Sequence, residues 1–151
     1  MTTAISPERP DSEEASALIE ELEAHLASLY PSESRHGYSV EKLLREGVAF
    51  FVIRVDSAPA GCGGVKLIDN SYGEIKRMYI RPQFRGLGLG KLMLGHLTDY
   101  ARNRGIEMLR LETGIYQQEA IALYERSGFK SVPPFGEYKP DPNSLFFEKE
   151  I

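Results

Sequence analysis

The segment Arg85-Gly86-Leu87-Gly88-Leu89-Gly90-Lys91 lies between a run typical of a β-strand, residues 74–80, and an amphipathic helix predicted from about residue 89. Glycines at alternate positions leave the backbone N–H groups of this turn uncovered by side chains. The first amides of a helix are also unpaired, and the helix dipole is positive at that end. The segment therefore predicts a strand-to-helix turn that binds phosphate.

The glycine spacing excludes two common phosphate-binding loops. A Walker A loop has four residues between its glycines and then Lys followed by Ser or Thr, whereas Leu92 follows Gly90-Lys91 here. The dinucleotide fingerprint G-x-G-x-x-G does not match Gly86-x-Gly88-x-Gly90 either. Two interpretations of the turn remain: a phosphate site of another kind, or a glycine-rich turn that binds no ligand.

Two segments together resemble the GNAT (N-acetyltransferase) superfamily. The pattern R-x-x-G-x-G of that family's motif A is similar to Arg85 to Gly90, and its N-x-x-A-x-x-L-Y-x-x-x-G-F is similar to QQEAIALYERSGF at residues 117–129. The resemblance covers about residues 50–151. Gln117 stands where the family usually has Asn, which is one methylene shorter, so the hydrogen bond from this position to the pantetheine arm is altered.

The periodicity predicts one α/β domain over residues 1–151, with residues 1–10 loosely ordered. Apolar faces and caps predict helices at 12–30, 39–47, 88–104 and 119–126, and alternation predicts strands at 48–55, 61–68, 74–80, 106–112, 129–132 and 145–149. Short turns make the first three strands an antiparallel meander, and the helix between the third and fourth makes those two parallel neighbours. The resemblance implies a mixed, mostly antiparallel central sheet, flanked by helices, with a splayed parallel pair.

The resemblance also implies the cofactor, acetyl-CoA, and the residues that bind it. Its pantetheine arm enters where the parallel strands separate and pairs with backbone groups of Met78 and Ile80, while Arg85 and Lys91 face the pyrophosphate or the 3′-phosphate. The N–H of Met78 meets the oxyanion. The full predicted cofactor-binding set is Met78, Tyr79, Ile80, Arg85, Gly86, Leu87, Gly88, Leu89, Gly90, Lys91, Gln117 and Tyr124.

Tyr124 is the predicted general acid because it occupies the family's tyrosine position. A phenol with a pKa of about 10 is a weaker acid than a thiol of about 8.5, so Tyr124 either protonates the departing sulfur or only hydrogen-bonds it. The structural alternative is an aromatic residue that packs its helix against the sheet.

Glu74 is the predicted general base. An amine with a pKa of about 10.4 is almost wholly protonated at pH 7, so a route for deprotonation is required. Glu112, near the end of the parallel neighbour, is the competing candidate, and a solvent-facing Glu74 paired with Lys66 or Lys76 is the structural alternative. We interpret Lys76 and Arg77 as ordinary solvated strand residues.

Composition narrows the classes of function that remain open. The chain has 151 residues, a net charge of −4, one cysteine and three scattered histidines, which argues against a nucleic-acid ligand, an internal disulfide and a metal site. No apolar run approaches the roughly 20 residues of a membrane helix, and the acidic N-terminus is unlike a signal peptide. We expect a cytoplasmic protein, for which a homodimer is compatible with the sequence.

We therefore predict an acetyl-CoA-dependent N-acetyltransferase that transfers the acetyl group directly to a primary amine in a ternary complex. No Cys–His or Ser–His pairing indicates a covalent acyl-enzyme. The acceptor stays unidentified, with a small molecule preferred to a protein; Tyr30, Tyr38 and the loop at residues 135–142 are expected to border its cleft. The alternatives are a non-catalytic acyl-CoA sensor and a transferase with a longer acyl donor.

Overall fold

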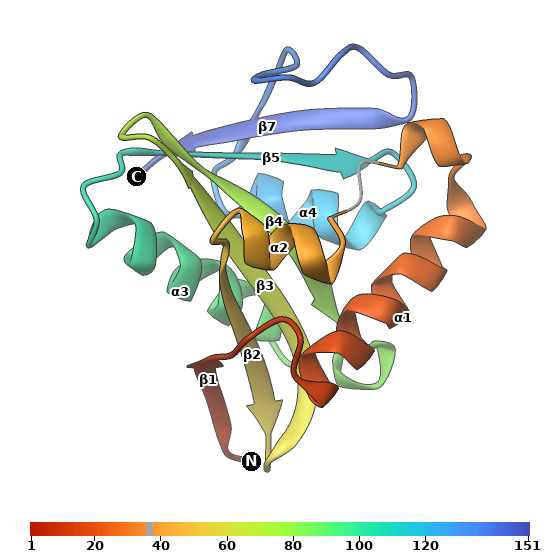
Figure 1. The fold of residues 1–151 in the computed structure, drawn as a ribbon, viewed down its shortest axis with the longest axis vertical. Helices are drawn as coiled ribbons and strands as arrows, with labels where there is room; N and C mark the ends of the chain where they lie inside the picture. The colour runs from red at the N-terminus through yellow and green to blue at the C-terminus, as the bar shows by residue number, and fades with distance from the viewer. Residues whose placement is uncertain (36–37) are drawn as a thin grey trace.

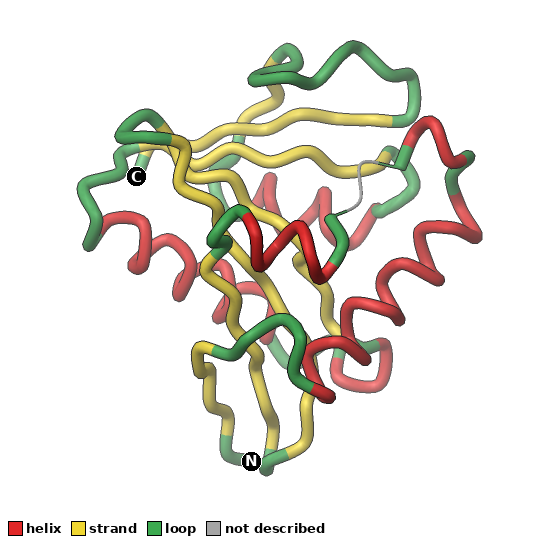
Figure 2. The backbone as a smooth tube through the Cα atoms, viewed as in Figure 1, coloured by secondary structure: helices red, strands yellow, loops and turns green. Residues whose placement is uncertain are grey.

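The computed structural model describes residues 1–35 and 38–151, and its centre is a seven-stranded sheet in the order β1-β2-β3-β4-β5-β7-β6 (Figures 1 and 2). The strands are β1 (Thr3–Pro7), β2 (Ala49–Val55), β3 (Ala58–Ile68), β4 (Tyr72–Ile80), β5 (Met108–Gly114), β6 (Lys130–Val132) and β7 (Ser144–Glu150). Only β4 and β5 are parallel; every other neighbouring pair is antiparallel. The predicted mixed sheet is confirmed.

Helices cover both faces of the sheet (Figure 1). One face carries α1 (Glu13–Leu29) and α2 (Val40–Arg45), and the other carries α3 (Leu89–Arg102) and α4 (Gln118–Arg126). Serines cap α1 and α2, since the Oγ of Ser12 and that of Ser39 each accept a backbone N–H at 3.1 Å. Each cap satisfies an otherwise unpaired amide in the first turn.

Two groups of buried apolar side chains fix these helices on the sheet. Met93, Leu97 and Leu109 belong to the group between the sheet and α3. Leu18 and Leu43 belong to the group beneath α1 and α2. Burying side chains of this size contributes roughly 1.5–3 kcal/mol each, which holds the helices that border the sheet's central split.

The parallel strands β4 and β5 separate soon after they meet. They pair only at Gly73 with Leu109 and at Glu74 with Arg110, and Figure 1 shows the two ribbons diverging toward their carboxyl ends. Beyond Glu74, the edge of β4 that faces β5 makes no strand pairing with it. This split confirms the prediction of a splayed parallel pair.

A β-bulge distorts β4 at the split. Gly64 of β3 pairs with Lys76 and Cys62 pairs with Tyr79, so two residues of β4, Arg77 and Met78, oppose one residue of β3. Arg77 has φ of 55°, a left-handed conformation that is uncommon for a residue other than glycine. A bulge re-aims the side chains around it and is frequent beside functional sites.

The N-terminus departs from its prediction. Residues 1–10 were expected to be loosely ordered, but Thr3–Pro7 form β1 and pair antiparallel with β2, from Thr3 opposite Val55 to Pro7 opposite Phe51. Asp56 strengthens this edge, because its carboxylate accepts the N–H of Thr2 at 2.8 Å. The pairing depends on a partner about fifty residues away, which a local pattern does not contain.

Candidate active site

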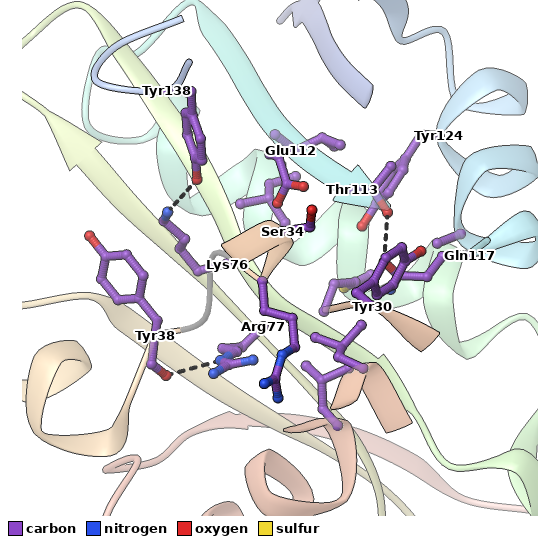
Figure 3. A pocket seen from close by; sticks show the side chains of 17 residues that line it. Tyr30, Ser34, Tyr38, Lys76, Arg77, Glu112, Thr113, Gln117, Tyr124 and Tyr138 are labelled. Atoms are coloured by element: carbon purple, nitrogen blue, oxygen red, sulfur yellow. Dashed lines mark hydrogen bonds between the residues drawn. The ribbon is translucent and has the colours of Figure 1, made fainter. Parts of the chain in front are cut away.

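A cavity of about 90 Å³ lies at the split between β4 and β5 (Figure 3). Its walls are completed by α1, by α4 and by the loop before β7, which is residues 133–143. Its lining residues are Leu22, Leu26, Tyr30, Ser34, Arg35, Tyr38, Ile75, Lys76, Arg77, Met78, Leu111, Glu112, Thr113, Gln117, Ala120, Tyr124 and Tyr138. Figure 3 shows the side chains of Lys76, Glu112 and Tyr124 around this one cavity.

The glycine-rich turn leads from β4 into α3 with its backbone open. Gly86 and Gly88 have φ of 82° and 78°, and a Cβ added to either would meet nothing within 4 Å. Gly88 is the N-cap of α3 and supplies no side-chain cap. The turn is therefore an uncovered helix N-terminus that fits a phosphate group, and a larger residue at either glycine would fill it.

The remaining residues of the turn have separate roles. Leu89 is buried and anchors the start of α3, whereas Leu87 and Lys91 are exposed. A Cβ on Gly90 would lie 3.0 Å from Cδ2 of Leu123. Gly90 thus suits the close approach of α3 to α4, where the Leu123 side chain would have to shift slightly to admit a Cβ, and it has no positive φ.

Arg85 turns back toward the strand that precedes it. Its Nε donates a 3.0 Å hydrogen bond to the carbonyl oxygen of Ile80, and its guanidinium lies 3.5 Å from a carboxylate oxygen of Glu119. The Ile80 carbonyl, predicted to pair with the pantetheine arm, already accepts one bond. Because a carbonyl oxygen has two lone pairs, it can accept a second.

Gln117 folds its side chain onto the end of β5. Its Oε1 accepts the N–H of Gly114 at 2.9 Å and the hydroxyl of Thr113 at 3.4 Å. The longer side chain thus reaches the backbone of the preceding turn with its oxygen. A hydrogen bond from this position to pantetheine would therefore come from the amide NH₂.

Tyr124 lies buried in the wall of the cavity. Its ring packs edge-on against Phe129, with centroids 5.7 Å apart, so it does pack its helix onto the sheet. Burial raises the pKa of the Tyr124 hydroxyl, and the carboxylate of Glu112 raises it further. The hydroxyl therefore stays protonated at physiological pH and is a donor to any group that enters the cavity.

Glu74 is buried, and its carboxylate makes an ion pair and a hydrogen bond. Its Oε2 lies 2.7 Å from Nζ of Lys76 and accepts the hydroxyl of Tyr138 at 2.6 Å. Glu74 is 6% exposed, so it is not solvent-facing, although it does pair with Lys76. The cavity is lined by Glu112 and not by Glu74.

The interpretation of Lys76 and Arg77 as solvated residues is wrong. They are 8% and 9% exposed, because their side chains contact α1, Tyr38 and the loop before β7. Lys76 donates to the hydroxyl of Tyr138 at 2.9 Å and lies 4.1 Å from the ring centroid of Tyr38 (Figure 3). Arg77 donates to the carbonyl oxygen of Tyr38 at 2.9 Å and pairs with Glu23.

The desolvation of Lys76 has an electrostatic consequence. Burial lowers the pKa of its ammonium group, and the Glu74 carboxylate opposes that shift. A buried charge is tolerated where a partner and hydrogen bonds compensate it. Glu74 and Tyr138 provide that compensation for Lys76.

The loop predicted to border the acceptor cleft is attached to the segment after α1. The Oγ of Ser34 donates to Asp141 at 3.1 Å and accepts from Nδ2 of Asn143 at 3.1 Å. Of the predicted loop residues, only Tyr138 lines the cavity. Tyr30 and Tyr38, also predicted to border the acceptor cleft, both line this cavity.

Sequence reasoning missed Arg35 and the bulge. Arg35 lines the cavity, and its Nε is buried without a hydrogen-bond partner. It lies in a short irregular segment that follows the 3₁₀ turn Ser32–Ser34, where no periodic pattern marks an inward-facing residue. The bulge, and the hydrogen bond from Arg77 to the carbonyl oxygen of Tyr38 beside it, likewise show no signal in the sequence.

Comparisons with known proteins show that this fold is that of an acyl-CoA N-acyltransferase. The family model described as "Acetyltransferase (GNAT) family" matches residues 15–129. An IAA acetyltransferase of Azospirillum brasilense is 42% identical over 148 residues, which cover 97% of each chain.

Two solved structures are similar over nearly the whole length. A Klebsiella pneumoniae protein assigned as an acyl-CoA N-acyltransferase is 39% identical with a TM-score of 0.84, covering 99% of this chain and 97% of that one. The PaiA N-acetyltransferase of Thermoplasma acidophilum, solved in complex with coenzyme A, is 25% identical with a TM-score of 0.78, and each chain is fully covered.

The chain belongs to the GNAT acetyltransferase family. It is an N-acetyltransferase, and acetyl-CoA is its co-substrate. Within residues 1–35 and 38–151, none of the helices combines the length and the hydropathy that crossing a membrane requires.

Proposed function

We propose that this enzyme transfers the acetyl group directly from acetyl-CoA to a primary amine, with both substrates bound at once. One observation carries the proposal: the cavity at the split of β4 and β5 has Met78, Glu112 and Tyr124 in its wall together. These residues supply the three requirements of the reaction, namely an oxyanion donor, a base and a donor to the departing sulfur.

The cofactor-binding groups follow the edge of the split. The amides at Gly86, Gly88 and the start of α3 bind the pyrophosphate, and the side chains of Arg85 and Lys91 add charge-assisted bonds. Backbone groups of Met78 and Ile80 pair with the pantetheine arm in the manner of an added strand. When bound, acetyl-CoA supplies the activated acyl group as a thioester.

Glu112 is the proposed general base. It lines the cavity, and Glu74, whose Oε2 accepts from Lys76 and Tyr138, does not. Glu112 takes the proton from the acceptor's amine, directly or through one water molecule. Glu74 instead compensates the buried charge of Lys76. It would reach the amine only through Lys76 or Tyr138, which already donate to it.

Tyr124 and Met78 act on the charges that develop during transfer. The N–H of Met78, one of the two bulge residues, donates to the oxyanion of the tetrahedral intermediate. The Tyr124 hydroxyl donates to the sulfur. Because its pKa is raised, hydrogen bonding to the thiolate is more favourable for Tyr124 than complete proton transfer.

A covalent acyl-enzyme on the cysteine is disfavoured by its surroundings. Cys62 is buried in β3, and its Sγ donates to the carbonyl oxygen of Arg77 at 3.3 Å. Burial raises the pKa of this thiol to about 12, so it is almost entirely protonated at neutral pH. Thiolate, and not thiol, is the nucleophilic form.

The test is release of free coenzyme A from acetyl-CoA with a panel of primary amines, varying both substrates. Direct transfer predicts intersecting double-reciprocal lines, while parallel lines would indicate an acyl-enzyme. Tight binding of acetyl-CoA without turnover on any amine would favour the sensor. Faster turnover with propionyl-CoA or butyryl-CoA would favour a longer acyl donor.

A further inference from the structure

The side chain of Arg35 is the feature of the cavity that the transfer chemistry leaves unused. Its Nε is buried and has no hydrogen-bond partner, although the residue lines the same cavity as Glu112 and Tyr124. Leaving a buried donor of a charged group unsatisfied carries a desolvation cost. A ligand that accepts a hydrogen bond from this Nε would remove that cost.

The other two cations in the cavity wall already have carboxylate partners. Lys76 pairs with Glu74 at 2.7 Å, and Arg77 pairs with Glu23. Among the described residues, no carboxylate pairs with Arg35. Arg35 is therefore the cation of this cavity that is positioned for an anion from outside the chain.

Planar guanidinium groups match carboxylates in shape as well as in charge, because two parallel N–H groups can meet the two oxygens. The cavity that Arg35 lines also has apolar and aromatic side chains in its wall, among them Leu22 and Leu26 of α1 and Tyr38. The bonds of Ser34 to Asp141 and Asn143 hold the loop before β7 against the segment that carries Arg35. A small acceptor suits this enclosed space better than a polymer does.

Resting on the function proposed above, we infer that the acceptor is a small free amino acid with an apolar side chain, whose carboxylate binds Arg35. Its amine faces Glu112, and its side chain contacts Leu22, Leu26 and Tyr38. The amine nitrogen forms an amide bond to the acetyl carbon as the carbon–sulfur bond breaks. The acceptor's ammonium group gives one proton to Glu112 before the attack and loses a second as the amide forms. The departing thiolate takes up one of these two protons and the other is released to solvent, so the products are an N-acetyl amino acid and coenzyme A.

Three acceptors of nearly equal size test the inference: leucine, leucinamide and 3-methylbutylamine. Only leucine carries a carboxylate. We expect kcat/KM for leucine to exceed that for either analogue by about 10-fold or more. The amide's amine is more often neutral at pH 7 than that of the free amino acid, so intrinsic reactivity would favour leucinamide, and a preference for leucine must come from binding.

Arg35→Gln should lower kcat/KM for leucine by about 10- to 100-fold and change the values for the two analogues by less than about 3-fold. Arg35→Lys keeps the charge but loses the two-pronged geometry, so its effect on leucine should be intermediate. Arg45→Gln is the matched control, since Arg45 is exposed on α2 and does not line the cavity. Affinity for coenzyme A should be the same in all three variants.

The outcomes separate this inference from the proposed function. Turnover of all three acceptors at similar rates by the wild-type enzyme would overturn the amino-acid inference and leave amine acetylation standing. A uniform effect of Arg35→Gln on all three would also overturn it. No coenzyme A release with any amine would overturn the proposed function itself. The comparison of the three acceptors with the wild-type enzyme tests the amino-acid inference even if a variant at Arg35 does not fold.

Discussion

The hydroxyl of Tyr138 donates a 2.6 Å hydrogen bond to Oε2 of Glu74 and joins the loop before β7 to the buried ion pair of β4. Lys76 donates to the same hydroxyl at 2.9 Å. The hydroxyl therefore acts as donor and acceptor between two charges. Burial and the Glu74 carboxylate both raise the pKa of Tyr138, so it remains a neutral phenol.

Tyr138→Phe should destabilise the fold by about 1.5–3 kcal/mol, because a hydrogen bond to a buried charged group is lost while the ring is retained. Urea denaturation measures the free energy of unfolding. Tyr116→Phe is the control, since Tyr116 is 55% exposed and should change stability by less than about 0.5 kcal/mol. Equal stability of the two variants would show that the Tyr138 bond contributes nothing.

Gly88→Val should weaken coenzyme A binding by at least about 10-fold, because a side chain would enter the uncovered turn at the start of α3. Isothermal titration calorimetry measures the affinity. Gly47→Val is a matched control: Gly47 also has a positive φ, 64° against 78° for Gly88, and open space around its Cβ position. It carries the same backbone strain away from the split, so it should lose stability and keep its affinity.

An unchanged affinity in Gly88→Val would remove the glycine-rich turn from the cofactor site. Equal loss of affinity in both variants would attribute the effect to strain rather than to the turn. Thermal unfolding of each variant, measured alongside, separates these two cases.

Local features of the fold were predictable because their causes are local. Ser12 and Ser39 cap helices through bonds to residues three positions away. The glycine-rich turn follows from the spacing of its glycines and the strand and helix on either side. The parallel pair β4–β5 follows from the intervening helix, since a crossover of that kind joins parallel strands.

Features set by distant partners were not predictable from the pattern. Burial of Lys76 depends on Tyr138, which is 62 residues away in the sequence. The bulge at Arg77 depends on the register of β3 against β4. Charged residues are ordinarily exposed, so the prior interpretation of Lys76 and Arg77 as solvated was reasonable for an undistorted strand and failed at this one.

Tyr124→Phe should lower kcat by about 10-fold or more and leave coenzyme A affinity within about 3-fold, because the hydroxyl contributes only when charge develops on the sulfur. Since the pKa of Tyr124 is raised, the hydroxyl stays protonated across the working pH range. The substitution should therefore lower the rate at every pH without shifting the limbs of the pH–rate profile. An unaltered kcat would leave Tyr124 with a packing role alone.

Glu112→Gln should lower kcat by about 10²–10⁴-fold if Glu112 is the base. Steady-state kinetics, with coenzyme A affinity as the binding control, measures this effect.

Glu74→Gln should instead affect stability, because it leaves the buried Lys76 ammonium without its ion-pair partner. Its unfolding free energy should fall by several kcal/mol, while kcat of the folded fraction falls much less than in Glu112→Gln. A Glu74→Gln enzyme that is as stable as the wild type but inactive would return the role of base to Glu74.

A surface pair beside the cavity gives a prediction for stability against pH. The hydrogen bond from Lys66, and then that from Tyr38, lower the pKa of Glu46 from 4.5 to about 2; the Tyr38 bond measures 2.6 Å. Because the pKa of Glu46 is lower in the folded protein than in the unfolded chain, its ionised carboxylate stabilises the fold fully above the unfolded-state pKa of 4.5. That stabilisation is lost as the pH falls toward the folded-state pKa of about 2. Glu46→Gln should therefore cost about 1 kcal/mol at pH 7 and progressively less below pH 4.5, measured by urea denaturation. Glu41→Gln, exposed on the same helix, is the control, and a cost for Glu46→Gln that stays constant from pH 7 to pH 2.5 would contradict the assignment.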